Sequence, residues 1–164
     1  MILIRKAKEE DIEVIQDLAE RTWQVTYSAY LAAEQIEYML QKMYNKGELL
    51  SQLQNGHTFL IAQEGQKDLG FAGYSLVNGG EQVYKLHKLY VLPESHGKGV
   101  GKILINEVVD RIKKKGGKSI QLNVNRNNKA SEFYKRAGFE IKETVDLDIG
   151  DGFYMNDYVM EKSI

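Results

Sequence analysis

The sequence predicts a mixed α+β fold, in which a mostly antiparallel sheet of about seven strands carries helices on both faces. Two observations lead to this prediction. Apolar runs typical of strands occur in groups and do not alternate singly with helices. The expected order is a strand, two or three helices, three strands, a helix, a strand, a helix and two strands, which differs from a regular βα repeat.

The N-terminal third is expected to be mostly helical. After Asp11, the apolar residues Ile12, Ile15 and Leu18 recur at helical spacing, and the pattern reaches Trp23 or beyond. The expected elements are a strand over 2–6, the helix that follows Asp11, a second helix near 33–44, and a short helical pattern from Leu49 to Leu53 that stops at Asn55-Gly56.

Three strands are expected in the middle of the chain. They cover 58–63 and 69–77, joined by a polar turn over 64–68, and then 82–92. Pro93 cannot donate a ladder hydrogen bond, so pairing should stop there. Strict alternation along the third strand would place Lys85, His87, Leu89 and Val91 on one face, and Tyr84, Leu86, Lys88 and Tyr90 on the other.

The remaining part of the chain carries two more helices and three more strands. These are a helix from about Gly99 to Lys115, a strand over Ser119–Val124, a helix that opens at Asn127 and reaches Arg136, and a strand pair over 139–148 and 153–161. Asn127 stands where a helix N-cap is expected. Because no repeat or linker interrupts the 164 residues, we expect a single domain over 1–164.

Composition narrows the function classes. Lys and Arg number 22 against 23 Asp and Glu, a net charge of −1, so the field of the whole molecule attracts neither nucleic acid nor an acidic membrane. The absence of cysteine excludes a disulfide, a thiolate metal site and an acyl-cysteine intermediate. We expect a cytoplasmic protein, because no signal peptide or long apolar stretch is found. The sequence does not fix an oligomeric state, and a homodimer is compatible with it.

The stretch over 89–102 passes from an apolar strand through three alternating glycines into an amphipathic helix. Apolar residues recur at helical spacing over 100–112, so Gly97, Gly99 and Gly101 lie where the first N–H groups of the helix have no internal partner. Such donors, together with the positive end of the helix dipole, favour phosphate. The stretch therefore predicts an anion site.

Two familiar phosphate motifs do not match this loop. A Walker A loop needs glycine where His96 stands and a hydroxyl residue where Ile103 stands. A Rossmann fingerprint needs glycine or alanine at Lys102 or at Leu104, depending on where it is started.

The loop resembles motif A of the GNAT superfamily of acetyltransferases, Gln/Arg-x-x-Gly-x-Gly/Ala, read here as His96-Gly97-Lys98-Gly99-Val100-Gly101 with His96 in place of Gln or Arg. The segment from Asn127 to Phe139 resembles motif B, Asn-x-x-Ala-x-x-Φ-Tyr-x-x-x-Gly-Phe with Φ apolar, at every fixed position. The chain is identified as a member of this superfamily on these two motifs, which lie within residues 86–140.

The resemblance implies the GNAT fold with a parallel strand pair that splays apart, acetyl-CoA as cosubstrate, and no metal. It also implies cofactor contacts from the strand end, the glycine loop and the motif B asparagine. These residues are Leu89, Tyr90, Val91, His96, Gly97, Lys98, Gly99, Val100, Gly101, Lys102 and Asn127. A main-chain N–H near Tyr90 and Val91 would polarise the thioester carbonyl.

Acetyl transfer from a thioester needs a neutral amine and a protonated sulfur leaving group. An alkylammonium has a pKa of about 10.4 and a thiol of about 8.5, so a base and an acid both help at neutral pH. The resemblance implies Tyr134, the motif B tyrosine, as the acid, with packing in the core as the alternative. His87 is the candidate base, because many members carry Glu at this point and aralkylamine acetyltransferases carry His. A purely structural histidine is the alternative.

In this superfamily the N-terminal helices and the last two strands select the amine. The candidate substrate-binding residues are Trp23, Tyr27, Tyr30 and Tyr154, because aromatic rings suit an organic ammonium, although the rings could equally be core. The region is loosely similar to the bacterial polyamine acetyltransferase branch. We expect an enzyme that acetylates a primary amine of a small molecule by direct attack in a ternary complex. A protein N-terminal or lysine acetyltransferase and a non-catalytic acetyl-CoA-binding regulatory module are the alternatives.

Overall fold

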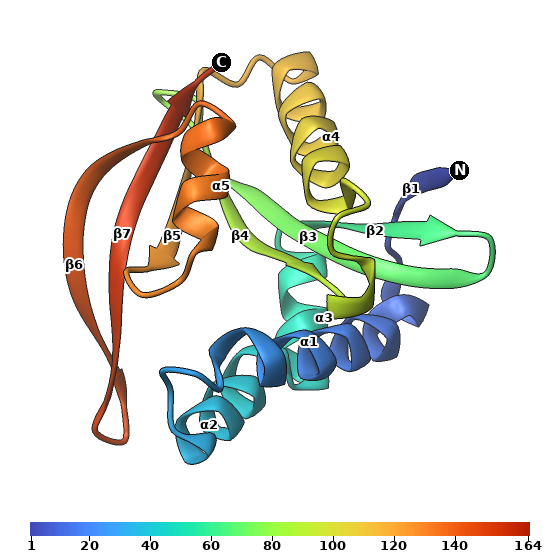
Figure 1. Cartoon of the computed structure of the whole chain (residues 1–164). Coiled ribbons are helices and arrows are strands. Elements are labelled where there is room, and N and C mark those ends of the chain that lie inside the picture. Colours follow the sequence, from blue (N-terminus) through green and yellow to red (C-terminus); the bar gives the residue numbers. More distant parts are fainter.

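All strands of the computed structural model, which describes residues 1–164, belong to one seven-stranded sheet in the order β1-β2-β3-β4-β5-β7-β6 (Figure 1). The strands are β1 Ile2–Lys6, β2 Thr58–Glu64, β3 Lys67–Asn78, β4 Val83–Val91, β5 Ser119–Asn125, β6 Glu140–Gly150 and β7 Phe153–Ser163. The helices are α1 Ile12–Tyr27, α2 Ala33–Tyr44, α3 Lys46–Gln54, α4 Val100–Lys114 and α5 Ala130–Arg136, with short 3-10 turns at Glu9–Asp11 and Pro93–Ser95. The predicted fold class and order of elements are confirmed.

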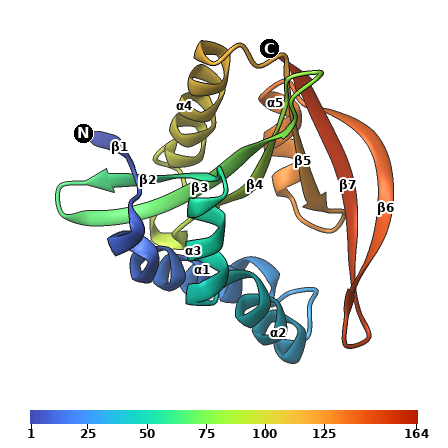
Figure 2. The ribbon, with the colours of Figure 1, turned by 180° about the vertical axis from the view of Figure 1, so that it is seen from behind.

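The sheet separates two apolar cores, and Figures 1 and 2 show the helices distributed over its two sides. On one side α4 and α5 pack on the sheet, with Leu104 of α4 fully buried. On the other side α1, α2 and α3 pack, with Leu18 of α1 fully buried. Consecutive residues of β2 divide between the cores, because Leu60 faces the first while Phe59 and Ile61 face the second. This layering fixes the position of α4 and of the loop that precedes it.

Strands β4 and β5 form the parallel pair of the sheet, and they pair over a short length. Their register runs from Val83 opposite Ser119 to Leu86 opposite Leu122 and then stops. Each strand continues with its other neighbour, β4 with β3 as far as Val91 and β5 with β7 as far as Asn125. The facing edges beyond Leu86 and Leu122 therefore have no ladder partner, and the predicted splay is confirmed.

A β-bulge interrupts the alternation of β4 at His87. Tyr74 of β3 is opposite Leu86, whereas the preceding Gly73 is opposite Lys88, so His87 is an extra residue. As a result Leu86 and Leu89 both face the core beneath α4, and the strict alternation expected from the sequence is wrong beyond Leu86. A bulge cannot be read from an apolar pattern, because the pattern records only which residues are buried.

Helix α5 begins at Ala130, three residues later than expected. The side-chain oxygen of Asn128 accepts a hydrogen bond from the Ala130 N–H at 2.9 Å, while the Asn127 N–H donates to the Asn125 side chain at 2.9 Å. The expectation that Asn127 caps the helix is therefore wrong, and its exposed side chain stays free. Other boundaries agree with the predictions within a few residues, and no helix is long and apolar enough to cross a membrane.

Candidate active site

The loop before α4 presents a row of backbone N–H groups. Gly97 and Gly99 have φ values of 88° and 75°, which L side chains rarely adopt, so these two glycines are needed to turn the chain into the helix. The first backbone bond at the start of α4 runs from the Ile103 N–H to the Gly99 carbonyl at 3.0 Å. The N–H groups that donate to no carbonyl or side chain of the protein are those of Gly97, Gly99, Val100, Gly101 and Lys102. These donors lie at the positive end of a fifteen-residue helix, an arrangement that suits a pyrophosphate.

The side chains around this loop differ in what they contact. The exposed His96 ring turns back to the end of β4, where its Nε2 donates to the Val91 carbonyl at 3.1 Å. Lys98 lies 3.5 Å from the Glu64 carboxylate, in an exposed pair, and Lys102 is exposed with no ion pair. His96 thus contacts the strand end on which the resemblance places the cofactor arm, while the two lysines stay beside the loop.

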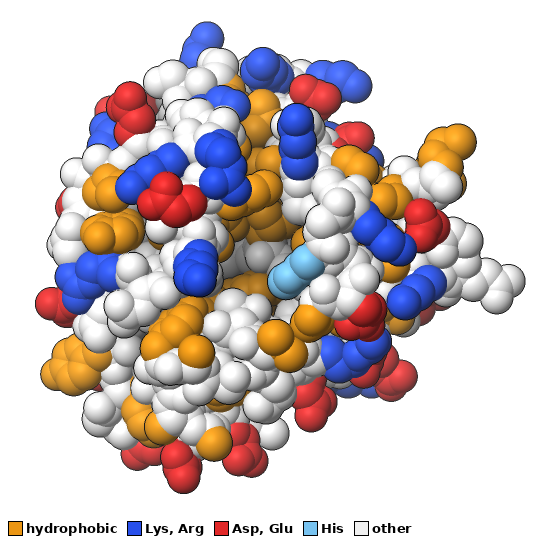
Figure 3. All heavy atoms as spheres, in the orientation of Figure 1, with side chains coloured by type: hydrophobic (Ala, Val, Ile, Leu, Met, Phe, Trp, Pro, Cys, Tyr) orange, Lys and Arg blue, Asp and Glu red, His pale blue; other side chains and the backbone are white.

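Figure 3 shows a hollow on this face between α4 and α5, with hydrophobic side chains in it and lysine and arginine side chains around it. It lies over the splayed ends of β4 and β5. Leu89 and Val91 of β4 are partly buried here against the core beneath α4. An apolar slot that ends at free N–H donors can hold a ligand with an apolar arm and an anionic end.

Tyr134 lies on α5 and is 7% exposed. Its ring contacts the rings of Phe133 and Phe139, at centroid distances of 5.2 and 5.7 Å, and its hydroxyl makes no hydrogen bond within the protein. Burial raises the pKa of Tyr134 above its usual 10, so the hydroxyl keeps its proton at neutral pH. The side chain combines the core packing that the sequence suggests with a hydroxyl free to serve a substrate.

The structure brings together Trp23, Tyr27 and Tyr30, three of the four candidate substrate-binding residues. The Trp23 and Tyr27 rings lie 4.6 Å apart, and Tyr30 meets Tyr27 edge-on at 5.7 Å. The Tyr27 hydroxyl is 2.9 Å from the hydroxyl of Tyr90 on β4, which links α1 to the splayed strand. Tyr154 lies apart from this group, is 51% exposed on β7, and uses its backbone carbonyl to accept from Gln35 at 3.1 Å.

His87 is half-buried on the bulge of β4. Its Nε2 is 2.7 Å from the Ser75 hydroxyl, and its ring stacks on that of His57 at 4.6 Å. Burial, followed by the charge of His57 and of Lys88, lowers the pKa of His87 to about 3. The ring is therefore neutral at neutral pH.

Lys88, the next residue along β4, is 9% exposed beneath α3. Its Nζ donates to the side chain of Gln52 at 3.0 Å and lies 5.4 Å from the ring centres of Tyr44 and Phe59. Burial lowers the pKa of Lys88 to about 8. The positive charge of Lys88 further disfavours protonation of the neighbouring His87 ring.

Asp157 is the buried charged residue that the sequence analysis missed. It lies on β7 opposite Asn125, is 1% exposed, and belongs to no ion pair. Its Oδ1 atom has no hydrogen-bond partner, and its Oδ2 has only a long contact of 3.5 Å with the Asn123 side chain. A single acid between Met155 and Tyr158 in an apolar strand is the signal that could have identified it.

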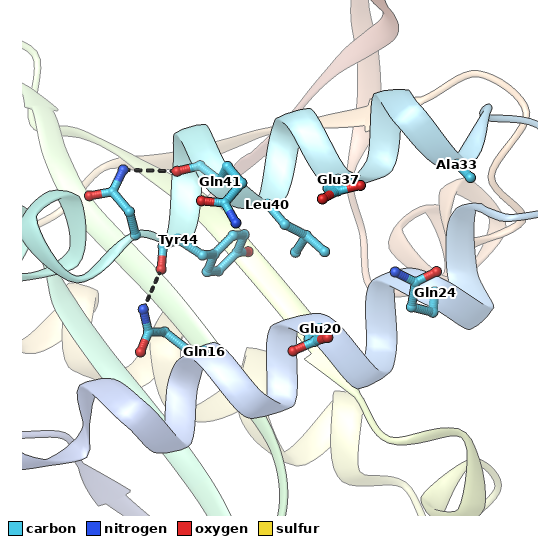
Figure 4. Close-up of a pocket in the computed structure, with 9 residues that line it drawn as sticks. Gln16, Glu20, Gln24, Ala33, Glu37, Leu40, Gln41 and Tyr44 are labelled. Carbon is cyan, nitrogen blue, oxygen red and sulfur yellow. Dashed lines mark hydrogen bonds between the residues drawn. The ribbon is translucent and has the colours of Figure 1, made fainter.

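A separate groove of about 380 Å³ lies between α1 and α2 (Figure 4). Glu20 of α1 and Glu37 of α2 face it, and the Gln16 side chain donates to the Tyr44 carbonyl at 2.9 Å. Its lining contains none of the loop residues over 96–102 and none of the candidate catalytic residues.

The sequence over residues 12–139 matches the family described as Acetyltransferase (GNAT) family. The chain belongs to this acetyltransferase family. Among curated GNAT relatives, spermidine N(1)-acetyltransferase of Thermoplasma acidophilum is 31% identical over 167 residues, which cover 98% of this chain and 96% of that protein. An uncharacterised N-acetyltransferase of Mycobacterium tuberculosis, Rv2669, is 28% identical over 156 residues, covering 94% of this chain and 98% of that protein.

Solved GNAT structures agree with this assignment. PaiA N-acetyltransferase from Thermoplasma acidophilum, crystallised with coenzyme A, superimposes with a TM-score of 0.84 at 30% identity and covers 100% of this chain and 99% of its own. The ribosomal-protein-S18-alanine N-acetyltransferase from Escherichia coli superimposes with a TM-score of 0.76 at 17% identity, covering 100% of this chain and 94% of its own. The second likeness shows the fold alone.

Proposed function

We propose that this GNAT protein transfers the acetyl group of acetyl-CoA to a primary amine of a small molecule, by direct attack within a ternary complex. The observation that carries the proposal is the row of free N–H groups of Gly97 and of residues 99–102, at the start of α4 and beyond the point where β4 and β5 separate. The similarity to a spermidine acetyltransferase over nearly the whole chain supports a polyamine-like acceptor.

In this proposal the loop N–H groups and the start of α4 bind the pyrophosphate, and the splayed strand ends receive the pantetheine arm. Acetyl-CoA supplies the acetyl group as an activated thioester. Beyond Leu86 the edge of β4 that faces β5 has no ladder partner, so a main-chain N–H near Tyr90 and Val91 on that edge can donate to the carbonyl oxygen. One such donor contributes about 2.7 to 4 kcal/mol in other enzymes.

Tyr134 acts as the general acid. As the amine nitrogen bonds to the carbonyl carbon and the carbon–sulfur bond breaks, the sulfur takes the Tyr134 proton, and the phenolate then regains a proton that the attacking nitrogen loses. The raised pKa of Tyr134 keeps the hydroxyl protonated before each turnover.

The assignment of His87 as the base stays a prediction. A neutral ring can accept a proton, but a pKa of about 3 makes it a weak acceptor compared with the amine, whose pKa is about 10.4. The contact with Ser75 also engages the Nε2 atom. The His87→Gln variant separates the two roles. If His87 is the base, the substitution lowers kcat/KM across the pH range. If His87 is only structural, the substitution changes stability and leaves kcat/KM unchanged.

The test of the proposed function is thiol release from acetyl-CoA with a panel of spermidine, 1,4-diaminobutane, an aralkylamine and a peptide with a free N-terminus. We expect saturable turnover with the small amines and little with the peptide. Turnover confined to the peptide would favour a protein acetyltransferase. Tight coenzyme A binding without turnover on any amine would favour a non-catalytic module.

A further inference from the structure

Five buried side-chain polar atoms have no hydrogen-bond partner in the protein. They belong to Trp23, Tyr30, His57, Ser95 and Asp157. Asp157 differs from the others because its carboxylate is a charged group, and burial of an unpaired charge costs far more free energy than burial of a hydroxyl or a ring nitrogen. Such a group calls for a compensating partner, which can be a ligand, an ion or a water molecule.

The register of β7 places this carboxylate on the same side of the sheet as α1. Along a strand, alternate residues share a face, so Asp157 points to the side of Met155 and away from Met160. Met155 packs against the core that contains Trp23 and Tyr27, whereas Met160 belongs to the core beneath α4. Asp157 therefore faces the aromatic residues of α1 and not the side that carries α4.

The neighbours of Asp157 leave it without a cation of its own. The Arg126 guanidinium, which follows the Asn125 that lies opposite Asp157, is paired with Asp146 on β6. Lys85 of β4 is near enough for its charge to lower the pKa of Asp157, but it forms no ion pair, and burial is the larger effect and raises that pKa. Burial raises the pKa of the Tyr27 and Tyr30 hydroxyls, and the charge of Asp157 adds to this effect in both. Tyr27 belongs to the core against which Tyr30 packs, and Met155, on the same face of β7 as Asp157, packs against that core too.

Asp157 also lies at the reactive end of the splayed strands. It is opposite Asn125, the last residue of β5, beyond the point where β5 leaves β4. The Tyr27 hydroxyl connects this region to Tyr90 of β4 at 2.9 Å. A buried carboxylate with a free oxygen, on the same side of the sheet as the Tyr27 and Tyr30 rings, offers what an aliphatic ammonium needs: an ion pair with a hydrogen bond, and aromatic faces around the charge.

We propose that the Asp157 carboxylate binds the ammonium group of a cationic aliphatic amine acceptor, with Tyr27 and Tyr30 beside it. This inference rests on the proposed function and specifies the acceptor chemistry: a positively charged amine is favoured over an uncharged one of the same shape. Asp157 is a specificity-determining residue in this scheme, and Tyr134 remains the acid.

The experiment compares Asp157→Asn with the wild type and with Glu143→Gln, an exposed acid on β6 that forms no ion pair. Steady-state kinetics with spermidine, calorimetric titration of spermidine into the coenzyme A complex, and thermal melting are measured for each. We expect Asp157→Asn to raise KM and the dissociation constant for spermidine at least about tenfold, the loss of one charge-assisted hydrogen bond. Coenzyme A affinity should not change, and Tm should stay the same or rise, because an uncompensated buried charge is removed.

A Tyr30→Phe variant provides a second test of the acceptor site if Asp157→Asn does not fold. It removes a hydroxyl with no protein partner, so stability should be retained while KM for spermidine rises about threefold. The inference is overturned if wild-type and Asp157→Asn bind spermidine equally, or if Asp157→Asn lowers Tm and leaves KM unchanged. The proposed function fails separately, by an absence of turnover in the wild type, and the calorimetric comparison still tests Asp157 in that case.

Discussion

Tyr134 is held in place by packing and not by hydrogen bonds. Its ring is fixed between Phe133 and Phe139, and the hydroxyl has no partner in the protein. A tyrosine kept only for its ring could be replaced by phenylalanine without loss, since the ring supplies almost all of the buried area. The acid role and the packing role therefore give opposite expectations for one substitution.

Tyr134→Phe should lower kcat by about 100-fold or more, the usual effect of losing a positioned acid. Tm and coenzyme A affinity should stay near the wild-type values, because the ring contacts are retained. Thiol release measured over a range of pH, with thermal melting as the control for folding, checks this. Wild-type turnover across that range would show that Tyr134 is a packing residue only.

The low pKa of His87 predicts how stability depends on pH. The folded state holds the ring neutral down to a pKa of about 3, whereas an unfolded histidine titrates near 6.5. Between these values the unfolded chain binds a proton that the folded chain does not. The free energy of unfolding should therefore fall as the pH falls below about 6.5.

His87→Gln should remove part of this dependence, because an amide can meet Ser75 without titrating. Urea unfolding of both proteins at pH 7.5 and at pH 5 measures it, with a smaller drop expected for the variant. The carboxylates with lowered pKa values, Asp11 and Glu161, are common to both proteins and cancel in the comparison. An equal fall in the free energy of unfolding of the two proteins would contradict the conclusion that the His87 ring is buried in its neutral form.

At the scale of elements, the loop and α4 act as one unit. Gly99 turns the chain with a φ of 75° and provides the carbonyl for the first bond at the start of the helix, while Gly101 stands inside the first turn with no positive φ. Only the first of these two glycines is needed for the backbone path. The motif that the loop resembles also admits alanine at the position of Gly101.

Gly99→Ala and Gly101→Ala form a matched pair for this unit. Gly99→Ala should cost about 1 to 2 kcal/mol of stability, because alanine is strained at that φ, and should weaken coenzyme A binding about tenfold or more. Gly101→Ala should keep the affinity and add up to about 1 kcal/mol of helix stability, because a methyl group there would meet Phe133 only at an ordinary 3.5 Å.

Calorimetric titration and denaturant unfolding of the two variants check both quantities. Equal affinities in the two variants would show that the loop conformation does not matter for binding.

The element boundaries could be predicted where periodicity is strong, as in α1, α4 and the strand pair β2 and β3. The bulge at His87 could not, since it is fixed by pairing with Gly73 and Tyr74 of β3 and not by the sequence of β4. The start of α5 was misplaced for a similar reason. Two adjacent asparagines can both form turns, and only the loop path decides that Asn128 bonds to Ala130.

At the scale of the whole molecule, the fold class and the loop followed from the sequence because both depend on local patterns. The side of the sheet proposed to bind the amine acceptor could not be predicted, because its residues are far apart in the chain. Asp157 comes to the side of the sheet that carries Tyr27 and Tyr30 only when β7 pairs with β5, and Tyr154 is half exposed although its residue type suggested the same role. Tyr134 is a candidate acid because of the resemblance to motif B. Helical periodicity alone does not distinguish it from the residues of the core.

The seven-stranded sheet lies between two cores and opens where β4 and β5 separate. The proposed function depends on what binds beside this opening. The net charge of −1 gives no general attraction for a polyanion, so affinity must come from the local donors over 97–102. The most direct measurement is calorimetric titration of coenzyme A into the folded wild-type protein. We predict saturable heat with one site per chain, and an absence of heat from folded protein would contradict the account.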